Sequence, residues 1–224
     1  GGFFDKSLIP IHHDDGSVAI AKDEYPRPGT TVATLAELKP TFQSFMDYPM
    51  DGTYTFGEVA RMTWPDLAID HVHHAGNSSG IVDGSSTVLL ASPDYAKANN
   101  LAPRARILAT ASAAGSPEYN LNEPVPSAQK ALEHANLTVD DIDLFEVNEA
   151  FAVVPMRFMK KLGIDHRKLN VNGGAIALGH PIGATGAILL GTLLDELERR
   201  ELQRGLVTLC AAGGLAPSII IERI

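Results

Sequence analysis

Short apolar runs separated by longer amphipathic stretches mark the second half of the chain. An apolar run of four to eight residues bounded by turn residues is typical of a buried strand. Between such runs, apolar residues that recur every three or four positions predict helices with one buried face. On these grounds we predict strands at residues 86–92, 106–110, 141–147, 206–209 and 218–221, and helices at residues 93–100, 125–135, 150–162 and 183–200.

Local residues mark the ends of several predicted helices. Ser92 is placed to cap the helix that follows it, and Gly163 is placed to end the helix at 150–162. Strands that alternate with helices, closed by two strands joined through a Gly-rich turn, predict a layered α/β domain. Residues 1–70 differ, because prolines interrupt them repeatedly. We predict a loop-rich region there, with one short helix at 35–39 capped near Thr34.

Composition describes an acidic globular protein. The chain has 224 residues, with 18 Lys and Arg against 27 Asp and Glu, so its formal charge is −9. An acidic chain without a basic stripe is poorly suited to nucleic acid or to an anionic membrane surface, and we expect neither as a partner. The single cysteine, Cys210, excludes an intrachain disulfide and favours a reducing, cytoplasmic compartment. Because the chain starts without Met, we expect a fragment or a processed product.

The first segment with candidate chemistry is Asn-Glu-Ala-Phe at residues 148–151, directly after a predicted strand. Polar residues at the carboxyl end of a strand lie where α/β folds place their active sites. Asn148 is therefore a candidate site residue. The alternative is that Asn148 only caps the next helix, a common position for asparagine.

The second segment is a Gly-rich loop at residues 170–186 that carries His180 just before Pro181. The long predicted helix begins directly after it. A helix N-terminus disfavours a protonated imidazole and favours a nearby anion. His180 is thus placed to act as a base or to donate to an oxyanion, unless it is only a structural histidine in a tight turn.

Cysteine and the remaining histidines complete the candidates. Cys210 ends a predicted strand before a turn of small residues, where it is either open to a substrate or buried as a small apolar side chain. Histidines at 71, 73 and 74 could place two imidazoles on one strand face. A metal site needs three or four ligands, and no further candidate stands nearby in sequence, so we expect no metal.

Taken together, these segments resemble the thiolase family in order along nearly the whole chain. Residues 148–151 match its Asn-Glu-Ala-Phe motif, residues 172–181 match its histidine signature, and residues 75–84 match a further family stretch. Cys210 falls in its C-terminal cysteine motif. The resemblance implies a thiolase-like layered α/β fold. Its parts would be the end of the loop domain at 1–74, the last strand region of the N-terminal domain at 75–103, and the C-terminal domain at 104–224.

The resemblance also implies an activity. Thiolases are acyltransferases that cleave a 3-ketoacyl-CoA with CoA or condense two acetyl-CoA molecules, with CoA thioesters as substrates and no further cofactor. Their chains are nearly twice as long, and the first half carries the nucleophilic cysteine. The implied partners are therefore acyl-CoA, CoA and a missing N-terminal half of the same protein, within a homodimer or homotetramer.

The family's residue roles carry over to matching positions. His180 would take the proton of the nucleophilic thiol and later help bind the thioester oxygen. Asn148 would hold a water in the same oxyanion hole, and Cys210 would exchange a proton with the acetyl carbon or the CoA sulfur. The backbone N–H of Ala212 would form a second oxyanion hole. Ala150 and Phe151 would contact the substrate.

Two departures from the family pattern stand out. Alanine replaces glycine at positions 212 and 216, which is costly only where the backbone needs a positive φ. Residues 122–126 replace a more Gly-rich segment near the CoA pocket, which leaves the acyl-chain preference open. Two other interpretations remain: a non-catalytic thiolase-like protein that binds acyl-CoA or lipid, and a short subunit that completes its site with another chain. The joint presence of His180, Asn148 and Cys210 favours the enzyme.

Overall fold

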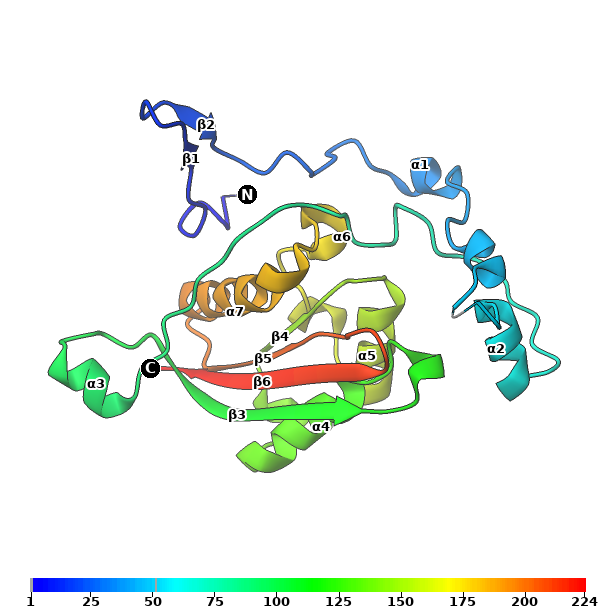
Figure 1. Cartoon of the computed structure of the whole chain (residues 1–224). Coiled ribbons are helices and arrows are strands. Elements are labelled where there is room, and N and C mark those ends of the chain that lie inside the picture. The colour runs from blue at the N-terminus through cyan, green and yellow to red at the C-terminus, as the bar shows by residue number, and fades with distance from the viewer. Residues whose placement is uncertain (1, 51) are drawn as a thin grey trace.

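A four-stranded sheet forms the centre of the computed structural model, which describes residues 2–50 and 52–224 (Figure 1). Its strand order is β3-β6-β5-β4. The central β5 lies parallel to β4 and antiparallel to β6, and β6 lies antiparallel to β3. The strands are β3 (Ala105–Ala114), β4 (Leu144–Val147), β5 (Arg204–Thr208) and β6 (Leu215–Arg223).

Helices cover both faces of this sheet, which confirms the predicted layered α/β architecture. On one face lie α4 (Pro124–Ala135) and α5 (Val153–Leu162), and on the other lies α7 (Ile182–Arg199) (Figure 1). β4 is buried on both faces: Phe145 and Val147 pack in the cluster of α4 and α5, whereas Leu144 packs in the cluster of α7. This alternation follows from the two-residue period of a strand. Even-numbered residues of β4 therefore face α7.

Most of the predicted helices are confirmed, with shifted ends. Ser92 caps α3 (Pro93–Ala98) by accepting a hydrogen bond from the Tyr95 N–H, and Gly163 ends α5 at a φ of 70°. The short predicted helix at 35–39 instead spans α1 (Val32–Ala36). A reciprocal capping box between Thr31 and Thr34 moves its start, because Thr34 acts as the third helical residue and not as the cap.

The predicted strand at 86–92 is wrong. This segment has no regular structure, and Val88, Leu89 and Leu90 are 40%, 75% and 68% exposed. A strand is stable only when its backbone N–H and C=O groups find a neighbouring strand. No such neighbour lies within the described part of the chain. The predicted strand at 141–147 is also too long, because Val139–Asp141 form a 3-10 turn and β4 begins at Leu144.

Residues before β3 form only short helices and strands joined by long loops, as the loop-rich prediction for residues 1–70 expected. Their elements are β1 (Ile11–His12), β2 (Val18–Ile20), α1, the 3-10 turn Gln43–Asp47, α2 (Phe56–Thr63) and α3. The segment between α2 and α3 passes over α7, and α3 lies beside the end of the sheet (Figure 1). Among the described residues, no helix is long and apolar enough to cross a membrane. The domain boundaries at 74 and 103 stay a prediction.

Candidate active site

Strand topology brings two of the three predicted catalytic residues to one edge of the sheet. β4 and β5 are parallel neighbours, and the ladder continues one step beyond β4, where the Asn148 N–H donates to the Thr208 carbonyl at 3.0 Å. Asn148 and Cys210 thus leave the sheet at the same end. Cys210 is half-buried and packs against the α4 and α5 cluster. Its burial raises the pKa of the thiol, which is therefore protonated at neutral pH.

His180, in the loop before α7, contacts Asn148, in the loop after β4. The Asn148 Nδ2 and His180 Nε2 atoms are 3.2 Å apart, and the Asn148 side chain is buried with 1% exposed. On its other side, His180 Nδ1 lies 2.6 Å from the hydroxyl of Thr185, in the first turn of α7. Asn148 does not cap α5, whose N-cap residue is Ala152. The capping interpretation of Asn148 is therefore wrong, and its side chain contacts His180 instead.

Burial of His180 lowers the pKa of its imidazole, because a low-dielectric surrounding disfavours the charged form. The ring is therefore neutral at pH 7. With a proton on Nδ1 donated to Thr185, the Nε2 lone pair accepts the hydrogen bond from the Asn148 amide; this tautomer is assigned from the network. A neutral imidazole with Nε2 unprotonated is the form of a general base.

Residues 77–80, in the segment between α2 and α3, hold the two loops together. The Ser79 N–H donates to the Ala150 carbonyl at 3.0 Å, the Ala152 N–H donates to Asn77 at 2.9 Å, and the His180 N–H donates to Gly80 at 2.9 Å. These bonds use backbone groups of residues 150–152, which explains why α5 starts at Val153 and not at the predicted Ala150.

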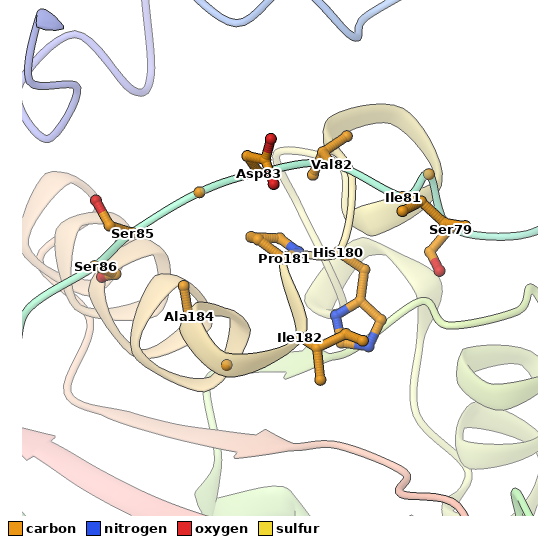
Figure 2. Close-up of a pocket in the computed structure, with 13 residues that line it drawn as sticks. Ser79, Ile81, Val82, Asp83, Ser85, Ser86, His180, Pro181, Ile182 and Ala184 are labelled. Atoms are coloured by element: carbon orange, nitrogen blue, oxygen red, sulfur yellow. The ribbon is translucent and has the colours of Figure 1, made fainter.

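A cavity of about 600 Å³ opens beside His180. Residues 79–86 form one wall and residues 180–184, at the start of α7, form the other. Figure 2 shows the first segment crossing above Pro181 and the first turn of α7. Among the described residues, the lining includes His180 but neither Asn148 nor Cys210. The structure thus gives His180 access to a cavity that Asn148 and Cys210 do not line.

Glu149 is a site residue that the sequence interpretation named only as part of a motif. Its carboxylate accepts hydrogen bonds from Asn170 Nδ2 at 2.9 Å and from the Ile176 N–H at 3.1 Å. Asn170 also bonds both backbone groups of Val147, at 2.8 and 2.9 Å. Glu149 and Asn170 therefore tie the loop after β4 to the Gly-rich loop that carries His180. The sequence signal that could have identified Glu149 is its position directly after Asn148.

Gly174 packs so closely against Glu149 that no side chain fits at this position. A Cβ atom there would lie 2.6 Å from each carboxylate oxygen of Glu149. We expect Gly174→Ala to lower the free energy of unfolding by about 1–3 kcal/mol, since Glu149 can move only by losing its hydrogen bonds. Chemical denaturation of the full-length protein measures this. Gly191→Ala in α7, where a Cβ meets open space, is the matched control and should be neutral or stabilising. Equal stability of the two variants would contradict the assignment.

The other predicted site residues have identifiable surroundings. The Phe151 ring packs edge-on against Phe42 at 5.4 Å and His73 at 5.2 Å between ring centroids. Ala150 contributes its carbonyl to the bond with Ser79. Their contact with a substrate stays a prediction. Within the described ranges there is no cluster of three or more potential metal ligands.

Ala212 lies in the turn between β5 and β6. Positive φ angles in this turn occur at Gly213 and Gly214, at 84° and 77°, and not at Ala212. The replacement of glycine by alanine therefore costs no backbone strain. The Gly213 N–H donates to the Asn120 side chain at 2.8 Å, whereas the Ala212 N–H has no acceptor in the part of the chain that the structure describes.

Comparison with known proteins shows the family to which this chain belongs. The model of the thiolase C-terminal domain matches residues 101–223. The acetyl-CoA acetyltransferase of Allochromatium vinosum is 41% identical over 99% of this chain and 51% of its own length. The 3-ketoacyl-CoA thiolase of Serratia proteamaculans is 41% identical over 100% of this chain and 53% of its own. The Bacillus anthracis acetyl-CoA acetyltransferase structure covers 100% of this chain and 51% of its own, with a TM-score of 0.82 and 35% identity. The chain spans about half the length of these relatives, and it belongs to the thiolase family.

Proposed function

We propose that this chain is the second half of a thiolase-type acyltransferase, which cleaves a 3-ketoacyl-CoA with CoA or condenses two acetyl-CoA molecules. The observation that carries the proposal is the direct contact of Asn148 with a neutral, half-buried His180 that borders a cavity. Two relatives, an acetyl-CoA acetyltransferase and a 3-ketoacyl-CoA thiolase, support the same reaction. The proposal includes a homodimer or homotetramer in the cytoplasm and no cofactor besides the CoA thioesters.

In the proposed reaction, the first half supplies a cysteine and His180 Nε2 removes its thiol proton. The thiolate attacks the ketone carbon of the 3-ketoacyl-CoA, and the bond between this carbon and the α-carbon next to the thioester breaks. The electron pair stays on acetyl-CoA as an enolate, and Cys210 gives that carbon a proton. Cys210, now a thiolate, takes the proton of the CoA thiol. The CoA thiolate attacks the acyl-cysteine, and the leaving cysteine thiolate regains its proton from His180.

Negative charge on oxygen develops twice in this sequence, and preorganised donors stabilise it most effectively. His180, once protonated, and a water held by the Asn148 amide serve the thioester oxygen, which becomes negative in the enolate. The Ala212 N–H, which has no acceptor among the described residues, serves the oxygen of the attacked ketone, since it lies two residues beyond Cys210 in the turn after β5. The raised pKa of Cys210 suits proton donation, because a thiol that stays protonated at pH 7 is ready to give its proton to carbon.

We expect the 224-residue chain alone to have no thiolase activity. Its one cysteine, Cys210, holds the proton-exchange position, so no thiol remains for covalent attack. The test is thiolysis of acetoacetyl-CoA, followed by loss of the enolate absorbance, with the isolated chain and with the chain mixed with the first half of a related thiolase. Measurable turnover by the isolated chain would contradict the proposed division of the site, whereas activity only in the mixture would support it.

A further inference from the structure

A buried carboxyl group, that of Glu146, lies two residues before Asn148. Glu146 belongs to β4, whose even-numbered residues face α7, and Asn148 directly follows the last residue of this strand, Val147. Its side chain is 2% exposed, and across the sheet it pairs with Val207, a buried residue of the α7 cluster. The reaction described above gives this carboxyl group no role.

Glu146 and Asn148 share an unusual property. Among the described residues, the Glu146 Oε2 and the Asn148 Oδ1 atoms are two of only three buried side-chain polar atoms without a hydrogen-bond partner. Buried polar atoms in folded proteins are almost always paired, with protein groups or with an ordered water. Two such oxygens, on residues two positions apart at the end of β4, point to one shared polar partner.

The charges around Glu146 favour its neutral form. Burial is the main cause that raises the pKa of its carboxyl group well above the usual range, and the negative charges of Glu149 and Glu196 add to it. Glu149 belongs to the loop after β4, and Glu196 faces it from α7. Glu196 is ionised, since Arg199, Asn172 and Arg200 hold its pKa at about 2. A neutral carboxyl group has an O–H to donate, which an ionised one lacks.

We propose that Glu146 is a positioning residue for the Asn148–His180 pair, and that its carboxyl group and the Asn148 amide oxygen share one buried water molecule. Glu146 donates to the water, and the water donates to Asn148 Oδ1. This fixes the amide with its nitrogen toward His180, where Nδ2 donates to Nε2. The imidazole proton then stays on Nδ1, against Thr185. The inference rests on the proposed function only in treating His180 as the working base.

The test compares three variants in the full-length protein with nitrogen-15-labelled histidine. Glu146→Gln keeps a neutral donor, Glu146→Leu keeps the approximate volume without one, and Leu144→Val perturbs packing on the same strand face. The magnetic resonance signals of His180, identified by their loss in His180→Gln, report tautomer and titration midpoint. We expect Glu146→Leu to mix the two tautomers and move the midpoint by at least about half a pH unit. Glu146→Gln and Leu144→Val should match the parent.

Unchanged His180 signals in folded Glu146→Leu, or an equal change in Leu144→Val, would overturn the inference. A crystal structure of the parent protein keeps it testable if Glu146→Leu does not fold: an ordered water within hydrogen-bonding distance of both oxygens is expected, and its absence overturns the inference. None of these measurements needs turnover. A failed thiolysis assay would leave them unchanged, and their failure would leave the proposed reaction standing.

Discussion

Replacement of His180 by alanine is expected to lower the turnover of the complete enzyme by at least about a hundredfold, as for loss of a general base. His180 is half-buried at the cavity wall, and its burial lowers the pKa of the ring, so that it is neutral and ready to take a proton at pH 7. Alanine removes both ring nitrogens, and with them the contacts to Asn148 and Thr185. Steady-state thiolysis of acetoacetyl-CoA measures the effect.

The control for this variant is His134→Ala. His134 lies exposed on α4, where its Nδ1 atom is 3.1 Å from the Thr110 carbonyl, and its loss should leave turnover within about twofold. Circular dichroism and the denaturation midpoint show whether each variant is folded. If folded His180→Ala kept turnover within a few-fold of the parent, His180 would not be the base.

Replacement of Cys210 by serine is expected to separate covalent attack from proton transfer. The variant in the complete enzyme should still form the covalent acyl-enzyme, because the cysteine of the first half makes that bond. It should lose condensation and proton exchange, since a serine hydroxyl is far less acidic than a thiol. Mass spectrometry after exposure to acetyl-CoA measures the adduct, and deuterium exchange at the acetyl methyl group measures proton transfer.

Ala211→Ser is the matched control, since it places the same hydroxyl on the neighbouring turn residue, whose side chain is exposed. Exchange in this control should remain close to that of the parent. Absence of an adduct in a folded Cys210→Ser protein would identify Cys210 as the covalent residue. Normal exchange would show that Cys210 is only a small side chain packed against the core.

Local sequence patterns are enough to predict the layered domain from β3 to β6. The spacing of apolar residues predicts its helices and strands. Local residues mark their ends, such as the cap Ser92 and Gly163 with its left-handed backbone. The motif positions of Asn148, His180 and Cys210 were also readable, because strand ends and helix starts place polar residues at predictable edges. These features depend on neighbours within a few residues, which a single sequence shows directly.

Other features depend on partners that are distant in sequence, and these features cannot be predicted from local patterns. Residues 86–92 have the composition of a strand, yet they form none, because no strand of residues 2–50 or 52–224 lies beside them. The start of α5 moved to Val153 because residues 77–80 take the preceding backbone groups. The choice of Asn148 as the partner of His180 joins residues 32 positions apart. Such contacts depend on the positions of loops in the folded protein, which the pattern of neighbouring residues does not predict.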